Sequence, residues 1–316
     1  MTALSINIVV PVYNKANYLE QTLGSINNQS IPSDCTLLVT AVNDGSTDNS
    51  LSVLEGIKSR FNNLKILDLE RNSGRSQARN AGARASQTQW LIFLDADCSW
   101  EDPKTLEKYV HQFKQGKRLY LGVTSSKEDD YWGRYYAKVY NKRITLTDIV
   151  QHATTANFGC HSSVFESTQG FPTEYKHYGF EDRDFLINAT LQCQQSEILY
   201  DPRLIASNND RTSLEEITKK MQESARYSAT IFKRRYPEVY KKTAYAKLDL
   251  NEHNRVIISC YRILRPLLTL IQKGTIGLFK LEWLPFSCRA FLTKLASGLA
   301  YLDGSYLAWH SKVKKD

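Results

Sequence analysis

Two carboxylates, Asp95 and Asp97, directly follow the apolar run Trp90–Leu94 in the stretch WLIFLDADC. Such a run is typical of a strand buried on both faces. In an extended segment the side chains at positions i and i+2 project to the same side, so we expect the two carboxylates to converge. They repel each other unless one takes up a proton or a cation lies nearby. Oxygen ligands of this kind suit Mg²⁺ or Mn²⁺, although aspartates at strand ends are also common turn formers.

Polar residues also follow two other apolar runs. Pro11-Val12-Tyr13-Asn14 ends the first run, and the stretch NDGSTD, which contains Asp44, ends the second. NDGSTD is typical of a turn and a helix cap. Asp44 stands before that turn, where a carboxylate can accept a hydrogen bond from the ring N–H of a pyrimidine base. Ordinary turn formation is the alternative.

The elements that position these loops alternate between strands and helices. Strands are predicted at residues 6–12, 37–42, 64–69 and 90–94, and helices at residues 18–29, 51–57, 76–85 and 105–113. This alternation predicts an α/β fold with a mostly parallel sheet and helices on both faces. Ligands of such sheets bind at the carboxyl ends of the strands, which is where the three polar loops are expected.

Composition and charge limit the class of protein. The chain of 316 residues has 42% hydrophobic and 23% charged residues, as expected for a globular protein with a substantial core. Its six cysteines are scattered without a C-x-x-C pair, which argues against a zinc site or a disulfide scaffold and suits a reducing compartment. The N-terminus has no basic segment before its apolar run, so we interpret that run as a first strand rather than a signal peptide.

The formal charge of +8 is unevenly distributed. Residues 1–210 hold 21 Lys+Arg and 24 Asp+Glu, a net charge of −3, whereas residues 211–316 hold 20 and 9, a net charge of +11. The C-terminal third interleaves cations with apolar and aromatic clusters, as helices at a membrane interface do. We therefore expect contact with an anionic membrane surface, with a helical subdomain that covers other protein as the alternative. Nucleic acid is not expected, because the aromatic residues lie among aliphatic ones rather than in a basic groove.

Four motifs in a fixed order resemble glycosyltransferase family 2, the inverting GT-A enzymes that use nucleotide-diphosphate sugars. They are VVPVYN, VNDGSTDNS, RNSGRSQARNAGARAS and WLIFLDADC, and the segment ARNAGARASQTQWLIFLDAD is an especially specific match. The resemblance covers roughly residues 5–205. It implies a Rossmann-like GT-A fold, to which the basic C-terminal region adds a helical appendage.

The resemblance also assigns roles on the donor side. Pro11, Tyr13 and Asn14 would line the nucleotide pocket, Asp44 would bind the base, and Arg79, in the ARN element, would border the nucleotide and the donor sugar. Asp95 would contact the ribose or the metal, and Asp97 would coordinate the Mn²⁺ or Mg²⁺ that bridges the diphosphate. For Arg79, a structural ion pair is the alternative.

The stretch YGFEDRDF supplies the acceptor side of the same resemblance. Asp182 is the candidate general base and Glu181 would orient the acceptor, although an acidic cluster also suits a solvated helix start. Related enzymes often supply a further metal ligand, commonly His, after this helix. Here the comparable stretch YDPRLIASNNDRTS has no His, so Asp210 or water would complete the shell. His161 is a weak candidate, because a lone His is more often structural than a ligand.

These inferences define the predicted organisation and function. Residues 1–210 would form the catalytic domain, with a nucleotide-sugar-binding half at 1–125 and an acceptor half at 126–210, and residues 211–316 the helical C-terminal region. The predicted enzyme moves a sugar, expected from a UDP-sugar, to a glycan or lipid-linked acceptor of a surface polysaccharide or lipopolysaccharide. It would work in the cytoplasm, peripherally on the inner face of the membrane. The alternatives are an inactive nucleotide-sugar-binding scaffold and a nucleotidyltransferase, although no Gly-rich phosphate loop follows the first strand.

Overall fold

The computed structural model describes residues 3–125, 131–144, 154–210 and 212–313. The chain divides into two compact units, one of residues 1–173 with 182–210 and one of residues 174–181 with 211–316. The predicted domain bounds stay predictions. Residue 126, which would divide the catalytic domain into its two halves, and residue 211, where the C-terminal region would begin, lie outside the described residues. Each unit is described below by itself.

An eight-stranded sheet forms the centre of the first unit, in the order β3-β2-β1-β4-β7-β6-β8-β5. Its strands are β1 (Leu4–Val12), β2 (Cys35–Asp44), β3 (Leu64–Leu69), β4 (Trp90–Leu94), β5 (Cys98–Ser99), β6 (Leu119–Ser125), β7 (Asn157–His161) and β8 (Ile198–Asn208). The first four are mutually parallel, whereas β7 runs antiparallel to both β4 and β6. The carboxyl ends of β1, β2 and β4 therefore meet at one edge, as predicted.

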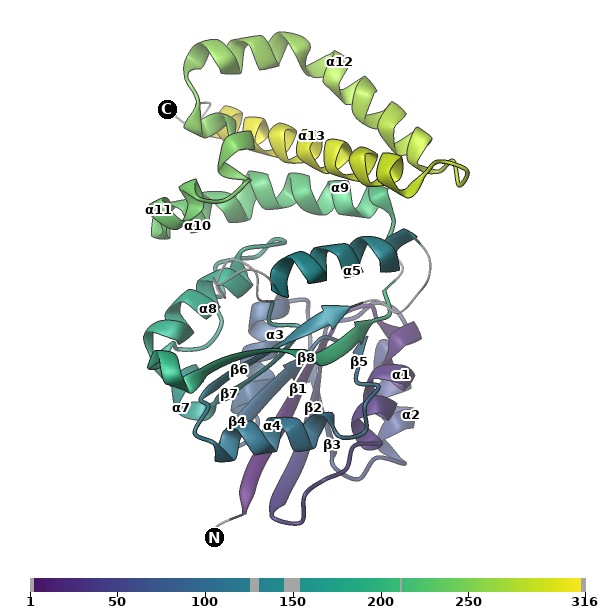
Figure 1. Ribbon diagram of the computed structural model, residues 1–316, viewed down its shortest axis with the longest axis vertical. Coiled ribbons are helices and arrows are strands. Elements are labelled where there is room, and N and C mark those ends of the chain that lie inside the picture. The colour runs from purple at the N-terminus through teal and green to yellow at the C-terminus, as the bar shows by residue number, and fades with distance from the viewer. Residues whose placement is uncertain (1–2, 126–130, 145–153, 211, 314–316) are drawn as a thin grey trace. The chain divides into compact units, whose positions relative to one another are not determined.

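Helices cover both faces of this sheet (Figure 1). They are α1 (Ala16–Asn27), α2 (Ser50–Lys58), α3 (Arg75–Arg84), α4 (Thr105–Lys114), α5 (Tyr131–Ile144), α7 (Ser162–Ser167) and α8 (Glu181–Leu191). One core packs α1, α2 and α4 against Ile6, Ile8 and Val10, and the other packs α3, α7 and α8 against Val9. Strand β1 thus alternates its side chains between two apolar cores, which is why consecutive residues such as Ile8, Val9 and Val10 are all apolar.

Helix α3 is tied to the sheet by a buried polar side chain in the middle of β1. The Asn7 amide donates to the carbonyl of Gly82 over 3.0 Å and accepts from the Thr40 hydroxyl over 2.8 Å. At Gly82 the helix approaches the sheet so closely that an added Cβ would lie 2.4 Å from Val9 Cγ1 and 2.9 Å from Val42 Cγ2. This contact fixes the height of α3 above the sheet.

The second unit is helical and includes the C-terminal region. Its elements are α9 (Leu214–Glu223), a π-helical turn (Ser224–Ser228), α10 (Ala229–Arg235), α11 (Pro237–Lys241), the 3₁₀ turns Ala246–Leu248 and Leu250–Glu252, α12 (Arg255–Phe279) and α13 (Phe286–Val313). Helix α13 packs along both α9 and α12 (Figure 1). The buried hydroxyl of Tyr301, on α13, forms a hydrogen bond with the hydroxyl of Tyr240. The Tyr240 hydroxyl donates to Asp249. The helical appendage that the sequence predicts is therefore present.

Replacement of Gly82 by alanine should destabilise the protein. The new methyl group would overlap two valines of the sheet, and overpacking of this kind costs about 1–3 kcal/mol. The free energy of unfolding, measured with urea, should fall by that amount. Gly56→Ala is the matched control, because an added Cβ there meets nothing within 4 Å inside α2, and it should stabilise by about 0.5–1 kcal/mol. Equal effects of the two variants would contradict the close-contact account.

Candidate active site

Asn14 joins the loop after β1 to the loop after β2. Its side-chain oxygen accepts from the backbone N–H of Thr47 over 2.8 Å, and its own N–H donates to the Ser46 hydroxyl over 3.1 Å. Asn14 has a φ of 51°, a left-handed conformation that asparagine tolerates better than most residues. Nearby, Pro11 is half-buried in β1, and the Tyr13 side chain is 44% exposed, open to a ligand at this edge.

Asp44, at the end of β2, holds the loop that leads into α3. Its two carboxylate oxygens accept from the backbone N–H groups of Ser73 (2.7 Å) and Gly74 (2.9 Å). Burial raises the pKa of Asp44, and these two donors oppose the rise. The carboxylate therefore has a structural task at this edge of the sheet, beside the base-binding role that the sequence predicts for it.

Asp95 and Asp97 lie in a tight turn, so the expectation of an extended segment is wrong. The N–H of Cys98 donates to the carbonyl of Asp95 over 2.9 Å, which closes the turn between β4 and β5. The two carboxylates have different cationic partners, Arg79 for Asp95 and Lys15 for Asp97. Each of the two carboxylates is thus paired with a protein cation of its own.

Arg79 bridges two of the predicted site residues. Its buried guanidinium, on α3, donates to Asp95 over 2.8 Å and to Asp182 over 3.1 Å. It also lies over the ring of Phe171, 5.2 Å from the centroid. The Arg79 side chain is 3% exposed, whereas the side chains of Asp95 and Asp182 are 33% and 27% exposed. The structural ion pair considered for Arg79 exists, and it lies inside the predicted site.

Asp182 is fixed by a second neighbour that sequence reasoning missed. The hydroxyl of Thr155 donates to its Oδ1 over 2.5 Å, and the N–H of Thr155 donates to its Oδ2 over 3.3 Å. Asp182 is the second residue of α8, directly after Glu181, which is buried. A solvated helix start therefore does not describe this cluster, and Asp184 in the same turn is fully buried. No motif pointed to Thr155, which precedes β7 in an ordinary polar stretch.

Lys15 is the other residue that the sequence analysis did not identify. Its ammonium lies 2.7 Å from Asp97 Oδ2 and 2.8 Å from Asp210 Oδ2. Asp210 also accepts from the Tyr18 hydroxyl over 3.1 Å. The signal was present, since Lys15 directly follows the VVPVYN motif at the end of β1. Asp210, considered as a replacement for the absent His, does reach Asp97 through this lysine.

Electrostatics at Asp97 remain unfavourable even with Lys15 in place. Burial raises the pKa of Asp97; Lys15 opposes this, while the carboxylates of Asp95 and Asp210 add to the rise. For Lys15 the two influences have the opposite signs. Burial lowers the pKa of the ammonium, but the carboxylates of Asp97 and Asp210 outweigh burial, so the pKa is raised. The site concentrates negative charge.

The donor set fits a hard divalent cation. Asp95, Asp97 and Asp210 offer carboxylate oxygens, and a Mg²⁺-type ion uses one or two of these with substrate phosphates and water. Burial and the neighbouring carboxylates raise the pKa of Asp97, and a cation bound beside it would favour its ionised form. Within the described ranges, no group of three or more His, Cys, Asp or Glu side chains is placed so that it could by itself hold a metal ion. His161 is not near: it packs on Trp90, at the other end of β4, and bonds Ser163.

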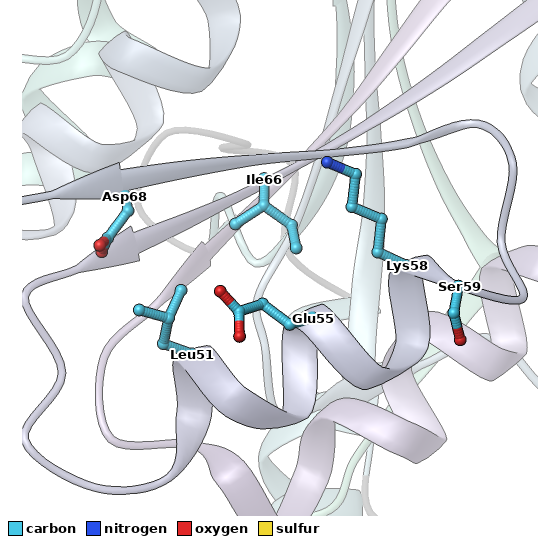
Figure 2. Close-up of a pocket in the computed structure, with 6 residues that line it drawn as sticks. All are labelled: Leu51, Glu55, Lys58, Ser59, Ile66 and Asp68. Carbon is cyan, nitrogen blue, oxygen red and sulfur yellow. The ribbon is translucent and has the colours of Figure 1, made fainter.

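A separate depression lies between α2 and the edge strand β3 (Figure 2). Its volume is about 620 Å³, and Leu51, Glu55, Lys58, Ser59, Ile66 and Asp68 line it. In Figure 2, Leu51 and Glu55 extend from the helix toward the strand that carries Ile66. None of the predicted site residues lines this depression, so the chemistry converges at the carboxyl edge of the sheet instead.

Carboxylates gathered at the carboxyl ends of the strands of an α/β sheet are the arrangement expected of an enzyme that binds its ligand at this edge. Residues 7–168, just over half of the chain, match the model of Glycosyl transferase family 2. The chain therefore belongs to this family of enzymes, as its motifs predicted.

Two curated relatives show how far the similarity extends. An uncharacterized glycosyltransferase of Synechocystis sp. is 28% identical over 157 residues, 49% of either chain. A poly(ribitol-phosphate) beta-glucosyltransferase of Bacillus spizizenii is 27% identical over 205 residues, 63% of this chain and 31% of the relative. The matched region thus spans half or less of the length of these two relatives.

Solved structures confirm the fold. A mannosyltransferase of Pyrobaculum calidifontis in complex with GDP-Man and Mn²⁺ superposes with a TM-score of 0.61 at 17% identity, covering 94% of this chain and 86% of its own. TarS residues 1–349 of S. aureus, in complex with UDP, gives a TM-score of 0.52 at 17% identity, covering 99% and 92%. The predicted GT-A fold with a C-terminal helical region is confirmed, while the roles of individual site residues stay predictions.

Arg79→Lys should destabilise the protein, because a lysine ammonium cannot reproduce the planar fork that spans Asp95 and Asp182. We expect a loss of about 1–3 kcal/mol in the free energy of unfolding, the usual range for a hydrogen bond to a charged group. Urea unfolding measures it. Arg84→Lys is the control: its exposed guanidinium, on the same helix, donates to the carbonyl of Gln169. A loss no larger than the control's would refute the bridging role.

Proposed function

We propose that the protein is an inverting glycosyltransferase that moves a sugar from a nucleotide-diphosphate sugar to a glycan or lipid-linked acceptor. One observation carries the proposal: Arg79 connects Asp95 to Asp182, the candidate base. Asp95 lies beside the carboxylates that would hold the metal of the diphosphate. One buried side chain thus holds a carboxylate on the proposed leaving-group side, Asp95, and the proposed base on the acceptor side, Asp182.

Asp182 suits the task of a general base. Thr155 and Arg79 both donate to its carboxylate, and these hydrogen bonds fix the position of the oxygen atoms that would accept the proton. In the proposed reaction an acceptor hydroxyl attacks the anomeric carbon and gives its proton to Asp182. The bond from that carbon to the phosphate oxygen breaks, and the nucleoside diphosphate leaves with the electron pair. One displacement from the opposite face inverts the configuration.

The donor-side residues would bind rather than react. Asn14 and Tyr13 lie at the end of β1, where they would contact the nucleotide, and Asp44 would accept from the base while it holds the loop at Ser73. A divalent ion on Asp97 and Asp95, when bound, would stabilise the negative charge of the leaving diphosphate. The Mn²⁺ named for the mannosyltransferase complex supports this assignment.

Surface polysaccharide is the proposed product class, and a UDP-sugar the proposed donor. The named activity of the Bacillus relative is glucosyl transfer to poly(ribitol phosphate), and another relative, of Staphylococcus epidermidis, is a teichoic acid poly(glycerol phosphate) polymerase. UDP occupies the TarS structure. A cytoplasmic site of action suits the six cysteines, which are free thiols.

Nucleotide release from a panel of UDP- and GDP-sugars, with Mn²⁺ or EDTA and a polyol-phosphate acceptor, tests this function. We expect release with one donor in Mn²⁺, loss in EDTA, and a fall of about 10²–10⁴-fold in Asp182→Asn with unchanged nucleotide affinity. Asp34→Asn, at an exposed pair with Lys114, is the control. Full activity of Asp182→Asn would falsify the mechanism. Nucleotide binding without turnover for every donor would favour the inactive scaffold.

Helix α12 supports the proposed contact with an anionic membrane. One of its faces packs in the second unit through Ile258, Tyr261, Thr275 and Phe279, whereas a long apolar stripe points outward. The outward residues include Val256, Ile263, Leu264, Leu267, Leu270 and Ile271. The helix carries four cations and no Asp or Glu. Apolar side chains flanked by cations suit the headgroup boundary of an anionic bilayer. Among the described residues, no helix combines the length and apolarity needed to cross a bilayer.

The double variant Ile263→Glu/Leu270→Glu should weaken membrane binding about tenfold or more, because it removes apolar contact and adds negative charge. Sedimentation with vesicles of anionic phospholipid measures this, and vesicles of phosphatidylcholine should bind the wild type less. Leu191→Glu is the matched control, since Leu191 in the first unit is 74% exposed, close to the 79% of Ile263. Unchanged sedimentation, or a variant that instead converts a dimer to a monomer in light scattering, would contradict the membrane assignment.

A further inference from the structure

The carboxylates of Asp97 and Asp210 both contact the ammonium of Lys15. Lys15 Nζ lies 2.7 Å from one and 2.8 Å from the other, and both contacts are to Oδ2 atoms. We propose that Lys15 is a built-in occupant of the cation position, which leaves when a divalent ion enters and then pairs with the donor's diphosphate. This inference rests on the proposed function, because that function supplies the ion and the diphosphate.

Ammonium and metal compete for the same oxygen atom. A Mg²⁺-type ion binds carboxylate oxygen at about 2.0–2.1 Å, so an ion on Asp97 Oδ2 would lie close to an ammonium that stays in contact with the same atom. Like charges at this separation repel strongly in a partly buried site. Entry of the ion at this oxygen therefore favours movement of Lys15 away from it.

The structure restricts that movement to the lysine side chain. The Lys15 backbone N–H donates to the Ser50 hydroxyl over 2.9 Å, and the N–H of Ala16 donates to Asp48 over 3.2 Å. The side chain is 25% exposed and has a flexible four-carbon stem, so its ammonium can rotate away while the chain stays in place. Asp210 also accepts from the Tyr18 hydroxyl, a bond that does not depend on Lys15.

The displaced ammonium needs a new anion. It is anchored at the end of β1, beside Asn14 and the proposed nucleotide pocket, and a diphosphate on the metal offers anionic oxygens within the same edge of the sheet. Donor binding then offsets the cost of displacing Lys15. Because such coupling is reciprocal, metal and nucleotide should each raise the affinity of the other.

Calorimetric titration of the full chain with MnCl₂, without nucleotide, tests the competition. Lys15→Met removes the charge but keeps much of the stem, so we expect it to bind Mn²⁺ about tenfold more tightly than the wild type. With saturating Mn²⁺, the same variant should bind UDP about tenfold more weakly, because the charge contact is lost. Lys108→Met is the matched control, since Lys108 pairs with Asp102 away from the site, and both affinities should stay at wild-type values.

Equal or weaker Mn²⁺ affinity in Lys15→Met would overturn the proposal, and so would the absence of Mn²⁺ binding in both proteins. Lys15→Gln provides a second uncharged variant, and thermal unfolding identifies the variant that retains the fold. Neither titration depends on turnover. An enzyme without measurable transfer that still gains Mn²⁺ affinity on loss of Lys15 would refute the proposed function and leave the role of Lys15 standing.

Discussion

The buried guanidinium of Arg79 is the interaction on which the candidate site depends. It holds Asp95 from the turn after β4 and Asp182 from the start of α8, residues 87 positions apart in sequence. A planar group with several donors can join two carboxylates in fixed directions, which a flexible ammonium cannot do. Its burial prevents water from competing, so the distance between the proposed leaving-group side and acceptor side is set by one residue.

Arg79 can hold this position only because α3 is itself fixed. Asn80, the next residue, exchanges two hydrogen bonds with the backbone of Phe171, whose ring lies beneath the guanidinium. On the same helix, Gly82 rests directly against the sheet. The position of the two carboxylates thus depends on a series of short contacts that runs from the strand to helix α3 and from its buried guanidinium to the carboxylates. The small residues of the ARNAGARAS segment serve this closeness.

The sequence predicted the fold well where periodicity determines the structure. The strands at residues 64–69 and 90–94 have the predicted bounds, because short apolar runs between turn residues leave little choice. The partners of the site residues were harder to predict. Thr155 contacts Asp182, 27 positions further along the chain, and Lys15 contacts Asp210, 195 positions further along. No local sequence pattern encodes such tertiary contacts. The sequence predicted an extended segment at Asp95, but β4 ends at Leu94 and the chain turns before the two-residue strand β5 begins at Cys98.

The buried amide of Asn7 has a consequence for how the sheet assembles. Its neighbours Ile6 and Ile8 face one core, while Asn7 faces α3 and is satisfied by Thr40 and the carbonyl of Gly82. A slip of one residue in the pairing of β1 with β2 would carry the amide into the aliphatic core and leave it without these partners. The buried amide of Asn7 therefore discriminates the native register of β1 from a one-residue slip while the chain folds.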